Sequence, residues 1–135
     1  MVVIIATLTI DVPREHFKTL SSNSRKHWRV KSDAAAELRM LARNAAKVTP
    51  RTFQRARCDV VLGWPDRRDR DAHNFYGAIK PLIDGIVTDA GWLPDDNDRY
   101  LDGPFARSTY TGRRGFVVVT LTFSELDLIS EGPNA

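Results

Sequence analysis

Residues 53–64 read Phe-Gln-Arg-Ala-Arg-Cys-Asp-Val-Val-Leu-Gly-Trp, and this stretch decides the fold. Its apolar and polar side chains alternate with the two-residue period of a strand that buries one face. Cys58 is the only cysteine, so an internal disulfide is excluded, and its place on the apolar face predicts a core residue rather than a reactive thiol. The residues expected on the buried face are Ala56, Cys58, Val60, Leu62 and Trp64.

A helix is predicted just before this strand, over residues 32–47, with Ser32 as its N-cap and Thr49-Pro50 after its end. One face of this helix is apolar and the opposite face is basic, so the basic stripe is expected to meet solvent or phosphate. The apolar positions are Ala34, Leu38, Leu41, Ala42 and Ala45, and the basic ones are Arg39, Arg43 and Lys47.

Residues 2–12 alternate as a further strand, and residues 13–31 then form a long polar segment that we predict to be a loop. Long loops in small domains are often functional, and this one interleaves cations with Trp28, which favours a nucleic-acid contact. Trp28 has two interpretations: stacking on an unpaired base, or packing against the first strand. The residues expected on the buried face of that strand are Ala6, Leu8, Ile10 and Val12.

The C-terminal half predicts a helix over residues 73–90 and two strands over 104–111 and 115–124, joined by a turn at 112–115. The element order β-α-β-α-β-β indicates an α+β (mixed α/β) fold with a single sheet of about four strands and two main helices. We expect one domain over residues 1–126 and a flexible tail over 127–135.

The composition is that of an ordinary globular chain: 135 residues, 42% hydrophobic and 27% charged. Because no apolar run approaches the roughly 20 residues that cross a bilayer, the sequence predicts a cytoplasmic protein without a membrane partner. The formal net charge of +3 is unevenly distributed, since residues 1–65 carry a net +7 and residues 66–102 a net −4. A basic surface favours phosphate binding, and clustered carboxylates favour the binding of a hard divalent cation. The simpler alternative is that the uneven charge belongs only to a solvated surface.

The acidic half places Asp71 before the 73–90 helix, Lys80 along it, and Asp95 and Asp96 after it. Carboxylates that hold Mg²⁺ or Mn²⁺ against a phosphodiester, with a lysine beside them, are the usual equipment of a metal-dependent nuclease. At ~100° per residue, a helix here would place four polar or small residues on one face, namely His73, Gly77, Lys80 and Asp84. Pro81 in the helix interior weakens this prediction, because a kink, or a helix that starts near Ala78, would move these four residues apart.

At these residues the chain resembles the RusA family of Holliday junction resolvases, which are small endonucleases of phage and prophage origin that act in DNA recombination and repair. The resemblance covers most of the chain. It depends on an ordered set of short motifs, each of which is weak alone: Ser22-Asn23, Pro65-Asp66-Arg67-Arg68, Arg70-Asp71, Asn74, Lys80, Asp84, Ala90-Gly91 and Asp95-Asp96.

The resemblance implies a homodimer that binds four-way DNA junctions and nicks two strands symmetrically with Mg²⁺, Mn²⁺ being the second candidate ion, and without a small-molecule cofactor. The metal-binding carboxylates would be Asp71 and one of Asp95 and Asp96, with Asp96 the better match, and Lys80 would act electrostatically. Basic residues would follow the DNA backbone in the loop and first helix, namely Arg25, Lys26, Arg29 and Lys31. Next to the acidic site, Arg67, Arg68 and Arg70 would contact phosphate, or pair with Asp66 and Asp69 instead.

The chain departs from the family pattern at His73, where the family usually carries a third acidic residue. An imidazole is a poorer Mg²⁺ ligand than a carboxylate and suits Mn²⁺ or a borderline metal better. His73 therefore ligates a different ion, acts through water, marks a weakened site, or simply begins the helix. A non-catalytic junction-binding protein is the resulting alternative function. The stretch from Asn74 to Lys80 is also longer than the family pattern, so the role of Lys80 assumes that the extra residues leave its direction unchanged.

Overall fold

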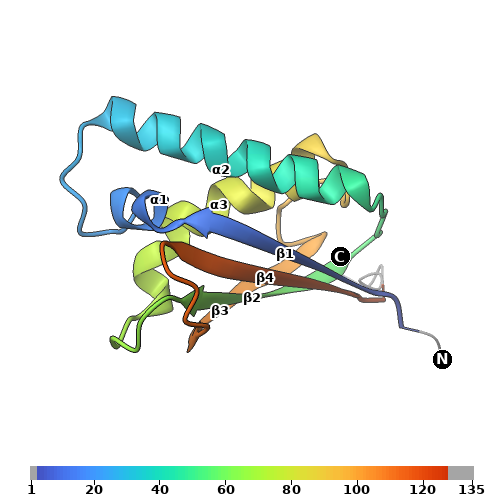
Figure 1. Cartoon of the computed structure of the whole chain (residues 1–135). Helices are drawn as coiled ribbons and strands as arrows, with labels where there is room; N and C mark the ends of the chain where they lie inside the picture. Colours follow the sequence, from blue (N-terminus) through green and yellow to red (C-terminus); the bar gives the residue numbers. More distant parts are fainter. Residues whose placement is uncertain (1–2, 128–135) are drawn as a thin grey trace.

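Within residues 3–127, which the computed structural model describes, four strands form one sheet and the helices cover one of its faces (Figure 1). This confirms the predicted α+β fold with two main helices; of the tail predicted over 127–135, residues 128–135 lie outside the described residues. The strands are β1 (Ile5–Pro13), β2 (Ala56–Trp64), β3 (Leu101–Tyr110) and β4 (Phe116–Glu125). The helices are α1 (Arg14–Thr19), α2 (Trp28–Val48) and α3 (Tyr76–Asp84), with a short 3₁₀ segment η1 (Ala72–Phe75) before α3 and a π-helical segment η2 (Gly85–Asp89) after it.

The strand order is β1-β4-β2-β3. The last strand, β4, lies inside the sheet and pairs antiparallel with both β1 and β2, so Leu121 faces Leu8 on one side and Val60 on the other. β2 and β3 run parallel, as expected for two strands joined by a helical connection. That connection carries α3 and the acidic segments, so the carboxylate-bearing loops are anchored to neighbouring strands.

The core lies between the sheet and α2 with α3. Every side chain predicted for the buried faces of the first two strands is buried, and Cys58 is fully enclosed, which confirms it as a core residue. Burial raises the pKa of the Cys58 thiol far above its usual value, so it stays protonated and unreactive. Gly85 permits the close approach of η2 to α2, because a Cβ atom there would lie 2.3 Å from the carbonyl oxygen of Arg39.

The polar segment at 13–31 is not a continuous loop. Residues 14–19 form α1, whose Phe17 and Thr19 are buried, and α2 begins at Trp28 rather than after Ser32. His27 replaces the predicted N-cap, since its Nδ1 accepts a hydrogen bond from the Arg29 backbone N–H at 3.1 Å. A helix of six residues shows too little periodicity to be found in the sequence, and the polar first turn of α2 hides its start.

The helix predicted over 73–90 is divided into η1, α3 and η2. The α-helical part begins at Tyr76 and includes Pro81, so Pro81 does not delay the helix start to Ala78. β3 begins at Leu101, three residues before the predicted boundary, because Gly103-Pro104 looks like a break in the sequence but is taken into a bulge. The bulge places one extra residue of β3 between Asp102 and Phe105, opposite the stretch from Arg57 to Asp59.

No helix in the described part of the chain combines the length and the apolar character that crossing a bilayer requires.

Candidate functional site

Lys80 on α3 lies between two carboxylates, and we call Lys80, Asp84 and Asp96 the acidic cluster. Its ammonium donates to Asp84 Oδ1 at 2.9 Å, one helical turn along, and to Asp96 Oδ2 from the loop after η2. The Lys80 hydrogen bond lowers the pKa of Asp96, and the bonds to Asp96 and Asp84 raise the pKa of Lys80. Lys80 and Asp96 were both predicted as site residues and are sixteen residues apart in the sequence, and folding brings their side chains into contact.

The loop that carries Asp96 is shaped by Asp95. One oxygen of Asp95 accepts from the Asp96 backbone N–H at 2.7 Å, and the other accepts from Asn97 Nδ2 at 3.2 Å. Upstream, the fully buried Trp92 anchors the loop, because its indole N–H donates to the Ala46 carbonyl at 3.3 Å. In this geometry Asp95 orients the loop and Asp96 presents the carboxylate.

A pocket of about 210 Å³ adjoins the acidic cluster, between α3 and the bulged start of β3. Its wall includes Tyr76, whose hydroxyl donates to the Pro104 carbonyl at 3.1 Å and ties α3 to the bulge. The other lining residues are Lys80, Ile83, Asp96, Leu101, Gly103 and Pro104. A concave surface with Lys80 and Asp96 in its wall is therefore available to a ligand.

Asp71 and His73 form a second group, at the start of η1. Asp71 Oδ1 accepts from the His73 backbone N–H at 3.0 Å and lies 3.1 Å from His73 Nδ1. The backbone hydrogen bond is the main reason that the pKa of Asp71 is lowered. Both side chains are well exposed, at 64% for Asp71 and 78% for His73. The His73 ring also packs edge-on against Tyr76 with ring centroids 5.5 Å apart, so Tyr76 connects this group to the pocket beside Lys80 and Asp96.

These donors fit a divalent ion in kind, since Asp71 and Asp96 are carboxylates held negative by low pKa values. Their arrangement is not a closed cage: among residues 3–127, no three His, Cys, Asp or Glu side chains are grouped so that they could hold a metal. The ammonium of Lys80 instead supplies the positive charge beside Asp96. The sharing of one ion by Asp71 and Asp96 stays a prediction.

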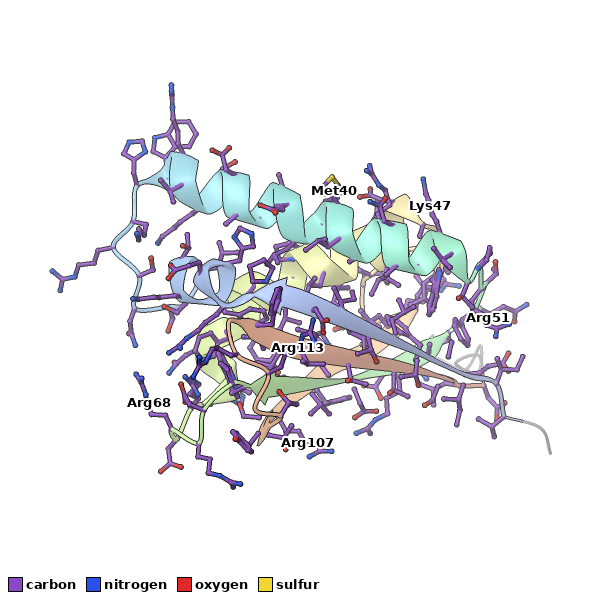
Figure 2. The ribbon with its side chains drawn as sticks, viewed as in Figure 1. Met40, Lys47, Arg51, Arg68, Arg107 and Arg113 are labelled. Atoms are coloured by element: carbon purple, nitrogen blue, oxygen red, sulfur yellow. The ribbon has the colours of Figure 1, made fainter. Side chains whose placement is uncertain are left out.

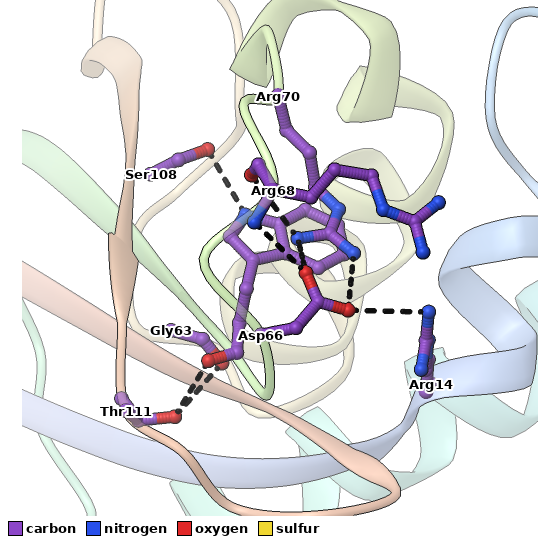
Figure 3. Close-up of polar contacts among 8 residues, drawn as sticks. Arg14, Gly63, Asp66, Arg68, Arg70, Ser108 and Thr111 are labelled. Atoms are coloured by element: carbon purple, nitrogen blue, oxygen red, sulfur yellow. Dashed lines mark hydrogen bonds and ion pairs between the residues drawn. The ribbon is translucent and has the colours of Figure 1, made fainter.

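The three arginines after β2 have different environments. Arg70 is only 10% exposed; it donates to both oxygens of Asp66 at 2.8 and 3.1 Å and covers the Trp64 ring. Arg67 stacks on Tyr110 at 4.1 Å. Figure 3 shows Asp66 between Arg70 and Arg14, while the Arg68 guanidinium extends away from Asp66. The ion-pair alternative thus holds for Asp66 and Arg70, whereas no such pair forms for Asp69 within the described residues.

The basic residues before and inside α2 lie on the surface. Arg25 and Lys26 are exposed in the loop, Lys31 Nζ donates to the Ser24 carbonyl at 3.0 Å, and Arg29 lies 5.4 Å from the centroid of the Trp28 ring. Trp28 itself is 65% exposed, so its core-packing interpretation is wrong and its stacking interpretation remains.

A larger pocket of about 470 Å³ is lined in part by residues 70–75, and we call it the basic pocket. Two of its cations, Arg14 and Lys18, were missed in the sequence because they lie on α1, inside the segment predicted as a loop. A helix of six residues left no periodic signal in the sequence that would have revealed these two cations. The lining residues are Arg14, Glu15, Lys18, Ser21, Asn23, Trp64, Arg68, Arg70, Asn74 and Phe75.

Comparison with known proteins identifies no family. No protein-family model matches the chain, and no curated protein matches it. Among solved structures, the chain is similar to a thiamine-monophosphate kinase from Stenotrophomonas maltophilia K279a, with 12% identity and a TM-score of 0.37. The match covers 91% of this chain and 30% of the kinase, so the chain spans less than a third of that protein's length.

Proposed function

We propose that the protein is a metal-dependent endonuclease that nicks four-way DNA junctions or related branched DNA, as in the RusA family that its motifs resemble. The observation that carries the proposal is the contact of Lys80 with both Asp84 and Asp96, next to a pocket that Tyr76 links to Asp71 and His73. These are the residue types that hydrolysis of a phosphodiester requires.

In this proposal Asp71 and Asp96 bind Mg²⁺ or Mn²⁺, with His73 as a further donor and Asp95 holding the loop. When bound, a divalent ion lowers the pKa of water and neutralises charge on phosphate oxygens. Lys80 balances the charge of Asp96 in the free protein. The Lys80 ammonium would supply positive charge to a nonbridging phosphate oxygen or the leaving group of a phosphodiester bound beside the acidic cluster.

The DNA contacts follow the surface cations. Arg25, Lys26, Arg29 and Lys31 approach the backbone at the start of α2, with Trp28 placed to stack on an unpaired base. Arg67 and Arg68 approach phosphate from the segment after β2, while Arg70 holds Asp66. A homodimer would place one site on each of two opposed strands, since a two-fold axis relates the two halves of a four-way junction.

The test is incubation of the purified chain with a synthetic four-way junction in Mg²⁺ or Mn²⁺. We expect paired, symmetric nicks that disappear in Asp71→Asn, while Asp69→Asn, a nearby exposed carboxylate without an ion pair, serves as the matched control. Junction binding with no nick in either metal would refute the nuclease activity.

A second candidate is a junction-binding protein that does not cut. It is favoured by the lack of three grouped metal ligands within residues 3–127 and by the imidazole at position 73. The substitution His73→Asp distinguishes the nuclease from the junction-binding protein. Mg²⁺-dependent cutting that appears only in this variant would support the junction-binding protein, and cutting by the wild type would exclude it.

A further inference from the structure

The basic pocket is chemically distinct from the acidic cluster. Four cationic side chains line it, Arg14 and Lys18 from α1 and Arg68 and Arg70 from the segment after β2, against the single carboxylate of Glu15. Its volume of about 470 Å³ exceeds what a phosphate group alone requires and falls within the ~300–1,000 Å³ of small-molecule sites. The pocket therefore suits an anion that carries an organic group.

Two of the four cations are available to such an anion. Arg14 and Arg70 both bond to Asp66, whose pKa falls to about 2 because it accepts from Arg70 and from the Arg68 backbone N–H. Within the described residues, Lys18 and the Arg68 guanidinium form no ion pair, and Figure 3 shows that guanidinium extending away from Asp66. A phosphate is the anion that these side chains bind best.

The remaining wall supplies groups that recognise a base. Asn23, Asn74 and Ser21 line the pocket, and amide side chains carry the donor and acceptor pair that base edges match. Asn74 is fixed in place, because its carbonyl accepts from the Ser22 N–H at 2.8 Å and its Oδ1 accepts from the Ser22 hydroxyl at 3.2 Å. The amide Nδ2 of Asn74 remains a donor.

We propose that the basic pocket binds one unpaired nucleotide of the DNA substrate, with Arg68 and Lys18 on its phosphate and Asn23 and Asn74 on its base. The nucleotide is unpaired because a base inside a duplex cannot bring its edge into a concave pocket. This inference rests on the proposed function, and it adds where the DNA strand lies relative to the metal site. Arg70 and Asn74 line the pocket, and the proposed metal ligands Asp71 and His73 lie between them in the sequence. The bound nucleotide then neighbours the phosphodiester that is cut.

The test is binding of a fluorescein-labelled single-stranded pentanucleotide to the full chain in EDTA, followed by fluorescence anisotropy. An otherwise identical oligonucleotide has an abasic site at its central position. We expect the wild type to bind the intact oligonucleotide at least about 5-fold more tightly than the abasic one. Asn23→Ala should remove this difference without changing the affinity for the abasic strand.

Arg68→Gln should weaken binding of both oligonucleotides and reduce the slope of log affinity against log salt by about 0.7. Arg51→Gln is the matched control, because Arg51 is an exposed arginine at the opposite end of the molecule from Arg68 (Figure 2). Equal effects of Arg68→Gln and Arg51→Gln, or equal wild-type affinity for the intact and abasic strands, would overturn the proposal.

Because the binding assay contains no metal, it separates this inference from the nuclease proposal. If the chain nicks no junction but shows the Arg68 and abasic effects, the nucleotide pocket is supported and the proposed function is refuted. If the chain nicks junctions normally and neither effect is seen, the proposed function is supported and the nucleotide pocket is refuted. Circular dichroism of each variant checks that the fold is kept.

Discussion

Residues 70–76 contribute Arg70, Asn74 and Phe75 to the basic pocket and Tyr76 to the pocket beside the acidic cluster, and the two regions have opposite charge arrangements. In the acidic cluster one lysine, Lys80, lies between the carboxylates of Asp84 and Asp96. Beside the basic pocket the arrangement is reversed, because the carboxylate of Asp66 lies between the guanidinium groups of Arg14 and Arg70, which line the pocket. Each region thus pairs one charge with two charges of the opposite sign and keeps an excess of one sign. The comparison teaches that one short segment can contribute to a region with excess negative charge, the proposed cation site, and to a region with excess positive charge, the proposed phosphate site.

The largest expected effect comes from removing the charge of Asp96. We expect Asp96→Asn to lower junction cleavage at least about 100-fold, because the proposed metal site loses a charged ligand, while junction binding persists through the basic residues. Cleavage rates and electrophoretic mobility shifts measure the two separately. Asp98→Asn, an exposed carboxylate in the same loop, is the control. Loss of binding and cleavage together would show that the two regions do not act separately.

A smaller effect is expected from removing the counter-ion of the acidic cluster. Lys80→Gln should lower cleavage about 10-fold to 100-fold, because one positive charge near the phosphate is lost. It should also raise the pKa of Asp96, whose low value is due first to the Lys80 hydrogen bond. Carboxyl titration by NMR measures this shift, and Lys47→Gln on the exposed side of α2 is the control. An unchanged pKa of Asp96 would contradict the contact.

The smallest effect concerns the counter-ion of the basic pocket. Folding lowers the pKa of Asp66 from 3.8 to about 2, so its carboxylate stabilises the fold above about pH 4 and this contribution is lost as pH falls toward 2. Asp66→Asn should therefore melt at a lower temperature than the wild type at pH 7, and the gap should narrow between pH 4 and pH 2. Thermal unfolding followed by circular dichroism measures it; a gap that is constant with pH would exclude the ion pairs as its cause.

Strand alternation made most of the sheet predictable, since period two is visible over nine or ten residues in β1, β2 and β4. The start of β3 was not predictable, because the Gly103-Pro104 bulge interrupts the pattern and its pairing with β2 is a tertiary effect. The order of strands was also hidden, since β4 enters between β1 and β2 although it is last in the chain.

Within the candidate site, the contact of Lys80 with Asp84 follows from helical spacing and was visible in the sequence. Its contact with Asp96 depends on how the buried Trp92 anchors the following loop, which no local pattern encodes. The basic pocket was missed for a similar reason: Arg14 and Lys18 come near Arg68 and Arg70 only because α1 forms and packs Phe17 against Trp64, with ring centroids 5.7 Å apart.

The most direct test of the proposed nuclease site is whether one ion binds both the Asp71 segment and the Asp96 loop. Mn²⁺ broadens NMR signals of nuclei near it, so substoichiometric Mn²⁺ added to the ¹⁵N-labelled chain reports which amides lie close to the ion. We predict that amides of residues 71–73 and 95–97 broaden together, and that Asp96→Asn abolishes the broadening at both segments. Broadening of one segment without the other, or of neither, would contradict a shared metal site.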